Sequence, residues 1–401
     1  MRQVTHMLLL LLLPVVAQAA DELECNDCAA PAAVSLAAAY TGEMWRRMSG
    51  MDPGNRYLDN IDLTLGVDGA EAFGANGWQF FAALLYNNGR AMNDDFAGTV
   101  QGISNIEASE ATRLFELWTQ YSSAAGDASW RFGLYDLNSE FDSIDAAGLF
   151  LNPSHGIGAE FSQSGLSGPS IFPVTGLALR GLKSFGSWSV QAAALDAVPH
   201  DGGHLDNPRL ELNSGDGALL VGEINYRPVS GLRLGGGYWR YTAQFDELMA
   251  DDSPGEPIRL GGNAGAYFIA ESPRLLPRAA AQGVNLFVRL GLAEDRINVI
   301  DQYYGAGAVY SGNSFNGGEY QLGLAAAIAQ AGRPWRNIQA AAAEPSNARE
   351  YNYELTYQVP LLEQLTLQAD LQYIRNPGFS RDADAAWVFG LRISVAQSWE
   401  W

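Results

Sequence analysis

The sequence predicts an all-β transmembrane antiparallel barrel of about 16 strands, and three observations lead to this fold class. Apolar residues make up 47% of the chain and charged residues 17%, yet the apolar residues are mostly dispersed in alternation with polar ones. That two-residue period places one face of each strand in an apolar solvent and the other in a polar one. Short connections also alternate with long ones, and aromatic residues gather near strand ends, as in outer-membrane barrels.

The N-terminus has the pattern of a secretory signal peptide. A basic residue, Arg2, precedes an apolar run from Leu8 to Leu13, and the small-residue motif Ala17-Gln18-Ala19 follows it. The run is too short to cross a membrane as a helix, so we expect cleavage and export. The predicted organisation is a signal peptide over residues 1–19, a short periplasmic segment over residues 20–34 and a transmembrane β-barrel over residues 35–401.

Cys25 and Cys28 are the two cysteines of the chain, and they lie just past the expected cleavage site. In an oxidising compartment, two such neighbours form a local disulfide more often than a redox centre. Two ligands do not fill a zinc coordination shell. The pair is therefore a disulfide candidate.

Candidate strands follow one another along the rest of the chain. In the second of them, for example, Ile61 and Leu63 lie on the opposite face from Asp62. An even number of strands is expected for a bacterial barrel built from one chain. The hairpin boundaries within residues 294–318 stay open. The expected strands cover residues 35–46, 60–68, 77–87, 112–122, 130–137, 174–183, 187–196, 217–227, 232–243, 263–271, 283–293, 299–311, 319–330, 349–359, 365–375 and 385–401.

The connections predict short turns at one end of the barrel and long loops at the other. The longest, of about forty residues between Tyr135 and Val174, is rich in Phe, Leu and Ile, and loops of that length are functional or disordered. Because its apolar content argues against disorder, we expect an ordered loop packed inside a hollow barrel. Short connections are expected at 122–128, 183–187, 227–231 and 359–364, and long ones at 89–111, 138–173, 197–216, 244–262 and 331–348.

The last candidate strand ends the chain with an aromatic residue, Trp401. Its apolar side chains at Trp387, Phe389 and Leu391 alternate with smaller or polar ones. A final strand of this kind resembles the signal by which outer-membrane proteins are recognised for insertion. The barrel-assembly machinery is therefore an expected partner, together with outer-membrane lipid and lipopolysaccharide.

Charge and histidine content argue against several functions. The formal net charge is -21 and no basic cluster is present, whereas nucleic acid requires a basic footprint. A catalytic site needs a nucleophile, a base and an orienting group together, but His6 leaves with the signal peptide and His155 suits loop packing better than base catalysis. His200 and His204 have ligand-like spacing, yet the two glycines between them argue against an aligning helix. We expect no cofactor, no metal and no enzymatic activity, with a barrel hydrolase as the less favoured alternative.

The strand faces opposite the apolar ones are expected to enclose the lumen. They mix acids, arginines, amides and aromatics, which favours neither an anion pore nor a cation pore. Interspersed donors and acceptors beside aromatic rings suit a neutral polyhydroxylated solute. A general diffusion pore and a plugged barrel without conductance stay open as alternatives. The predicted lumen-facing residues are Asp62, Glu116, Trp118, Arg131, Tyr135, Arg180, Gln191, Glu223, Asn225, Arg233, Arg289, Glu354, Gln368, Asp370 and Arg392.

Several stretches resemble carbohydrate-selective porins of the OprB type. They run from the first expected strand towards the last, and the longer ones are specific. The acid-rich residues 251–256 and the alanine-rich residues 339–343 match no pattern of that family. The matching stretches are Tyr40–Trp45, Arg56–Leu65, Val100–Glu107, Arg113–Trp118, Arg131–Phe141, Ser154–Gly158, Phe161–Gly165, Gly168–Pro173 and Asp295–Asn298.

The resemblance implies a sixteen-stranded barrel in the outer membrane of a Gram-negative bacterium, with a constriction formed partly by inward-folded loops that passes glucose and similar mono- or oligosaccharides. It leaves open the preferred sugar, the choice between monomer and homotrimer, and which of Arg180, Arg289 and Arg392 face the solute. The resemblance places Glu116, Trp118, Arg131, Tyr135, Asp136, Asn138, Glu140 and Asp142 near the narrow zone.

Overall fold

The structure of the chain is a computed structural model. It describes residues 32–49, 54–89, 92, 96–200, 215–229, 231–248, 258–276, 282–314, 318–344 and 346–401. The expected signal peptide, the Cys25 and Cys28 pair, and His204 lie outside the described residues.

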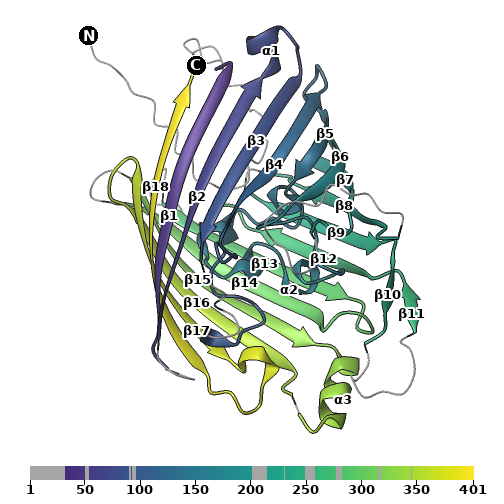
Figure 1. Cartoon of the computed structure of the whole chain (residues 1–401). Coiled ribbons are helices and arrows are strands. Elements are labelled where there is room, and N and C mark those ends of the chain that lie inside the picture. Colours follow the sequence, from purple (N-terminus) through teal and green to yellow (C-terminus); the bar gives the residue numbers. More distant parts are fainter. Residues whose placement is uncertain are drawn as a thin grey trace.

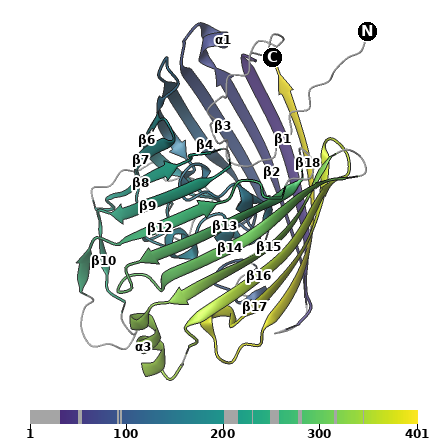
Figure 2. The same ribbon diagram turned by 180° about the vertical axis from the view of Figure 1, so that it is seen from behind.

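Sixteen antiparallel strands close into a barrel, in which the last strand pairs with the first (Figures 1 and 2). All sixteen predicted strands are present, so the predicted fold class is confirmed. The barrel strands are β1 (Val34–Arg47), β2 (Asn55–Asp68), β3 (Trp78–Asn88), β4 (Ala111–Ser122), β5 (Ala128–Tyr135), β6 (Gly176–Phe185), β7 (Trp188–Asp196), β8 (Ala218–Tyr226), β9 (Arg233–Tyr241), β12 (Ala264–Glu271), β13 (Gly283–Ala293), β14 (Ile300–Asn313), β15 (Glu319–Ala331), β16 (Arg349–Pro360), β17 (Leu365–Arg375) and β18 (Ala386–Glu400).

The strands alternate between an apolar outer face and a more polar inner face. In β18, Trp387 and Phe389 are 42% and 40% exposed, whereas their neighbour Val388 is 0% exposed. A side-chain period of two requires that alternation when a sheet separates two solvents. The outward residues are therefore those that the sequence pattern assigns to lipid.

Connections differ in length between the two ends of the barrel. We call the end where β1 begins and β18 finishes the terminal end, since Ser35 pairs there with Glu400, and the opposite end the loop end. The predicted short and long connections are confirmed, but residues 48–54 and 294–299 are short although they lie at the loop end, and residues 272–282 are longer than these although they lie at the terminal end. The open hairpin boundary is settled, because β14 begins at Ile300. Connections at the terminal end are 69–77, 123–127, 186–187, 227–232, 272–282, 314–318 and 361–364, and those at the loop end are 48–54, 89–110, 136–175, 197–217, 242–263, 294–299, 332–348 and 376–385.

Short helices and one small hairpin lie in these connections. Residues 244–262, expected to form a long loop without strands, contain the pair β10 (Gln244–Asp246) and β11 (Arg259–Gly261). Among the described residues no helix combines the length and the apolar character needed to cross a membrane. The helices are α1 (Gly69–Phe73), η2 (Leu137–Ser139), η3 (Ala146–Leu149), η4 (Pro153–His155), α2 (Ala159–Ser162), α3 (Arg333–Ala341) and η5 (Pro377–Phe379).

The connection over residues 136–175, which we call the long loop, folds into the barrel, where Figure 1 shows its helix α2 behind the front strands. Its side chains Phe141 and Phe161 are 0% exposed. The Phe161 ring stacks on Trp239 of the wall with centroids 4.9 Å apart. The burial of these rings offsets the entropy lost by ordering such a long segment. The prediction of an ordered loop packed inside the barrel is therefore confirmed.

Candidate functional site

The inner wall has a covered part and an uncovered part. On β8, β9 and β13, the inward side chains Glu223, Arg233 and Arg289 are only 1–4% exposed, because the long loop lies on them. On β4 and β5, Trp118 and Arg131 are half-buried. The inward side chains Asp62, Phe81, Trp118 and Arg131 on β2 to β5 thus keep some exposed surface, and we call this part of the inner face the uncovered wall.

An aromatic–arginine cluster is made of Phe81, Trp118 and Arg131, which lie on the uncovered wall, and of Tyr135, which is only 1% exposed beside them. The Phe81 and Trp118 rings stack with centroids 5.0 Å apart at 22°. The Arg131 guanidinium lies 3.9 Å from the centroid of Trp118 and 5.3 Å from that of Tyr135. Cation–π contacts of this kind hold a guanidinium flat against a ring. The cluster presents a fixed apolar surface beside a cation.

Gly133 allows β4 and β5 to approach beside this cluster. It pairs with Trp118 across the two strands and has a φ of 140°. A Cβ atom built on it would lie 2.1 Å from the Leu117 carbonyl oxygen and 2.7 Å from the Trp118 Cα. Only glycine fits such an approach. The position of Trp118 relative to Arg131 therefore depends on this residue.

Glu140, at the start of the long loop, joins the cluster to the wall. Arg180 donates two hydrogen bonds to its carboxylate, at 2.8 and 2.5 Å, and the Tyr135 hydroxyl donates a third at 2.5 Å. Arg131 lies 3.6 Å from the same carboxylate. Burial alone would raise the pKa of Glu140, but the Arg131 and Arg180 guanidinium groups outweigh it and hold the pKa below its ordinary value. Glu140 is therefore an anion between two arginines.

Glu116 and Asp136 form an acidic pair beside the cluster. The Glu116 carboxylate accepts hydrogen bonds from the Trp118 indole at 3.1 Å and from the Asp136 backbone N–H at 3.2 Å. Burial and the nearby Glu116 carboxylate raise the pKa of Asp136 to about 8. Near neutral pH, Asp136 is therefore mostly protonated.

Asp142 and Arg289, both predicted at or near the lumen, lie between the long loop and the covered wall. Arg289 forms a bidentate pair with Asp142 at 2.9 and 2.6 Å and a second with Glu160 at 2.8 and 2.7 Å. The Asp142 backbone N–H donates to Glu223 at 2.9 Å. These side chains are 0–3% exposed. They anchor the long loop to the covered wall and are almost inaccessible to solvent.

Other predicted residues also hold the loops in place. The Glu354 carboxylate accepts backbone N–H groups of Leu151 and Asn152 at 2.5 and 3.1 Å. The Asn138 amide donates to three carbonyl oxygens within the long loop, at 3.1–3.2 Å. Asp370 accepts from Gln372 at 3.0 Å and is 1% exposed. Each of these side chains therefore forms hydrogen bonds with other protein groups in this conformation.

Arg392 and Asp62 lie on the inward faces of β18 and β2. Arg392 donates to Glu43 at 2.6 Å and also contacts Asn105 of the connection 89–110. Asp62 is half-buried and accepts from Asn60 at 3.2 Å. The structure thus gathers Glu116, Trp118, Arg131, Tyr135, Asp136, Glu140 and Arg180 at one place on the wall, while Asp62 and Arg392 lie on other strands.

Phe81 was missed by the sequence prediction. The run from Phe80 to Leu85 is apolar on both faces, so alternation cannot say which ring points inward. The polar residues Gln79 and Asn87 have the same parity as Phe81, and this is the signal that could have identified its inward face.

The histidines form no centre for metal or base chemistry in the described part of the chain. No group of three or more His, Cys, Asp or Glu side chains suited to a metal ion occurs among the described residues. His155 is 1% exposed and packs against Phe150 and Phe287 at 5.0 and 6.0 Å. Burial lowers its pKa to about 3, so it is a neutral packing residue.

Comparison with known proteins places the chain in a family. The family model described as "Carbohydrate-selective porin, OprB family" matches residues 52–396. Porin B of Pseudomonas aeruginosa is 27% identical over 396 residues, covering 89% of this chain and 86% of that protein.

Solved structures agree at the level of the fold. The high-pH structure of Pseudomonas putida OprB has a TM-score of 0.78 at 22% identity and covers 91% of this chain and 94% of its own. The low-pH structure of that protein has a TM-score of 0.56 at 17% identity, with coverage of 91% and 93%. Since the family model spans most of the chain, the chain belongs to the OprB family of carbohydrate-selective porins.

Proposed function

We propose that sugars cross the barrel along the uncovered wall and that the aromatic–arginine cluster forms its narrow zone. The observation that carries the proposal is the Arg131 guanidinium held 3.9 Å from the Trp118 ring centroid in a half-buried position. A pyranose ring offers C–H groups to an aromatic face and hydroxyl groups to a cation and carboxylates. Trp118 and Phe81 supply the first kind of contact, and Arg131 with Glu116 supplies the second.

The charges around the cluster favour a neutral solute. Arg131 and Arg180 face Glu140, Arg131 also interacts with the Glu116 carboxylate, and the protonated Asp136 adds little charge near neutral pH. A site with near-balanced charge attracts neither ion strongly. Glucose and similar mono- or oligosaccharides are the proposed solutes. The hydrolase alternative is dropped because the family consists of porins, which are passive channels.

The proposed location is the outer membrane of a Gram-negative bacterium, with the loop end outside, as the length asymmetry of such barrels requires. Residues 1–19 are removed on export, residues 20–34 precede the barrel in the periplasm, and β18 presents the insertion signal to the barrel-assembly machinery. Lipid and lipopolysaccharide surround the apolar outer face. Native mass spectrometry of the detergent-solubilised protein distinguishes a monomer from a homotrimer.

The test is single-channel recording in a planar bilayer with glucose added. A glucose-dependent fall in current is expected, and Trp118→Ala should weaken glucose binding about fivefold, since aromatic contact contributes about 1 kcal/mol. Arg131→Ala should also weaken it. The matched control is Trp130→Ala, because Trp130 is 51% exposed on the outer face of the next strand.

Three outcomes would contradict the proposal. A pore whose current ignores glucose would be a general diffusion channel. A protein without conductance would be a plugged barrel. Equal glucose binding in Trp118→Ala and the unsubstituted protein would place the narrow zone elsewhere.

A further inference from the structure

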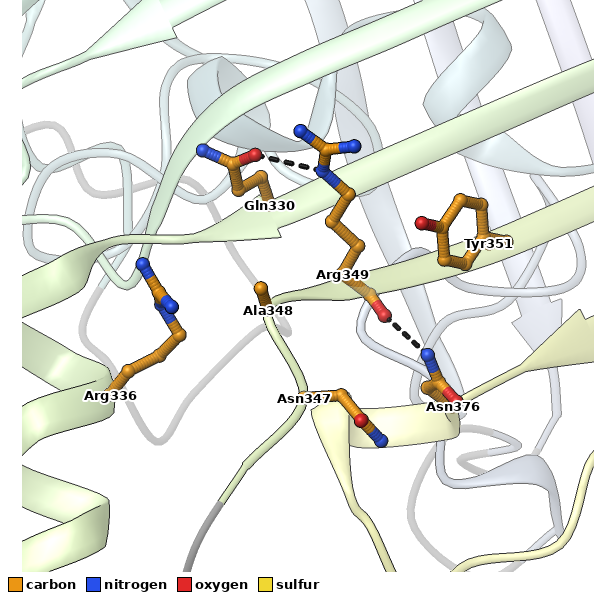
Figure 3. Close-up of a pocket in the computed structure, with 7 residues that line it drawn as sticks. All are labelled: Gln330, Arg336, Asn347, Ala348, Arg349, Tyr351 and Asn376. Carbon is orange, nitrogen blue, oxygen red and sulfur yellow. Dashed lines mark hydrogen bonds between the residues drawn. The ribbon is translucent and has the colours of Figure 1, made fainter.

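A polar pocket opens on the outside of the barrel at its loop end (Figure 3). Glu350 and Asn352 of β16 are 0% exposed on the inner face, so their alternating neighbours Arg349 and Tyr351 point outward. Gln330 of β15 points outward for the same reason, between buried Ala329 and Ala331. The pocket has a volume of about 340 Å³ and is lined by Gln330, Arg336, Asn347, Ala348, Arg349, Tyr351 and Asn376.

Two guanidinium groups enter this pocket, from α3 and from β16, on either side of Ala348 (Figure 3). Arg349 donates its Nε to Gln330 at 2.9 Å, and Arg336 donates its Nε to the Ala331 carbonyl oxygen at 3.1 Å. Within the described part of the chain, neither guanidinium forms an ion pair with a carboxylate. The terminal Nη groups of both arginines therefore keep donors that fit a phosphate.

Hydrogen bonds fix the rim of the pocket. The Asn376 amide donates to the Arg349 carbonyl oxygen at 2.9 Å, and the Asn347 amide donates to the Ser380 carbonyl oxygen at 2.7 Å. Among the described residues, the acidic side chain of Asp301 lies close by and interacts with Gln330. Two arginines against one carboxylate leave the pocket cationic in a chain whose formal net charge is -21.

Aromatic rings locate the pocket relative to the bilayer. Outward-facing Tyr351, Tyr353 and Tyr373 stack in sequence at 6.4 and 6.3 Å, and Trp387 follows Tyr373 at 4.7 Å. Rings of this kind mark the membrane–water interface. The pocket lies at the loop-end edge of this aromatic band, and next to it Leu355 is 44% exposed towards lipid. An occupant could therefore place a polar headgroup in the pocket and acyl chains on the apolar wall.

We propose that this pocket binds the phosphorylated headgroup of a lipid in the outer leaflet, the chemistry that lipopolysaccharide presents. The proposal rests on the proposed membrane location but not on the sugar passage, because the pocket is on the opposite face of the wall. If the pocket bound no lipid headgroup, the glucose-dependent current would still be expected, so the two proposals are tested separately.

The experiment is native mass spectrometry of the full mature protein in detergent, with bisphosphorylated lipid A and with lipid A from which both phosphates have been removed. Retention of the first and weak retention of the second are expected. The double variant Arg336→Gln/Arg349→Gln should retain bisphosphorylated lipid A about thirtyfold less, since each of the two arginines near a lipid surface contributes about 1 kcal/mol. An unchanged glucose-dependent current shows that the variant barrel is folded.

Arg240→Gln is the matched control, because Arg240 is an exposed residue at the loop end of β9, on another side of the barrel. It should retain the lipid as the unsubstituted protein does. Equal losses in this control and the double variant would show that any outward arginine suffices, and equal retention of both lipids would show that phosphate is not recognised. Complete displacement of the lipid by millimolar inorganic phosphate would make the pocket a site for soluble anions, and each of these three results would overturn the proposal.

Discussion

The covered wall and the uncovered wall carry the same kinds of inward side chain but use them differently. Under the long loop, Arg289 is 1% exposed and saturated by two carboxylates. On the uncovered wall, Arg131 is 11% exposed in its side chain and lies on an aromatic ring. An inward side chain of the barrel therefore anchors a loop where the loop covers it, and can contact solute where no loop covers it. Substitutions on the covered wall should therefore alter conductance and unfolding temperature, whereas substitutions on the uncovered wall should alter glucose binding.

The largest effect is expected for Arg289→Ala on the covered wall. It would leave Asp142 and Glu160 buried without their cation, and removing one partner of a buried ion pair costs about 3–5 kcal/mol. The long loop should detach, so single-channel conductance should rise and the unfolding temperature should fall. Arg240→Ala, on the outer face, is the control. Unchanged conductance would show that Arg289 does not hold the loop.

Glu140 lies where the two walls meet. Glu140→Gln should lower the free energy of unfolding by about 2 kcal/mol, less than Arg289→Ala, because this is the scale of a hydrogen bond to a charged group. Arg131 and Arg180 would lose their shared anion. We expect more frequent current fluctuations and a shift of ion selectivity towards anions, measured by reversal potentials in a salt gradient. A shift towards cations would contradict this account of the charge.

Phe81→Ala tests the uncovered wall alone. Loss of the ring that stacks on Trp118 should weaken glucose binding about fivefold, with little change in the unfolding temperature. Phe80→Ala is the matched control, since Phe80 is 40% exposed on the outer face of the same strand. If both variants bind glucose equally well, the aromatic stack plays no part in solute contact.

The smallest effect is expected from pH. Because the pKa of Asp136 is raised to about 8, raising the pH through 8 removes its proton and adds one negative charge beside Glu116. Cation selectivity should therefore increase modestly between pH 7 and pH 9, about one unit either side of that pKa. Asp136→Asn should reduce this increase. A variant that retains the full increase would assign the titration to another group.

The sequence predicted the barrel well because two solvents impose a strict alternation. All sixteen strands were found, and the largest shift is at β2, which begins at Asn55 where residue 60 was expected. The start of β2 was missed because Asp59 on its outer face and Leu58 on its inner face break the alternation. The hairpin of β10 and β11 was missed because its three-residue strands are too short to show a period.

The site was harder to predict, for a physical reason. Alternation assigns a face to Arg131 and Arg289 alike, but only the path of the long loop seals one and leaves the other in contact with free space. That path depends on contacts between residues far apart in the chain, such as Asp142 with Arg289. Their assignment as solute-binding residues remains a prediction for the bilayer experiments.

The pairing of β1 with β18 has a consequence for synthesis. All other neighbouring barrel strands are consecutive in the chain, apart from β9 and β12. Ser35 of β1, in contrast, pairs with Glu400 of β18, which is synthesised last. A product cut short before that point has two unpaired strand borders, which lipid cannot satisfy. A chain truncated before β18 should therefore form no partly active channel, because only a chain that includes β18 can close the barrel and remain stable in the membrane.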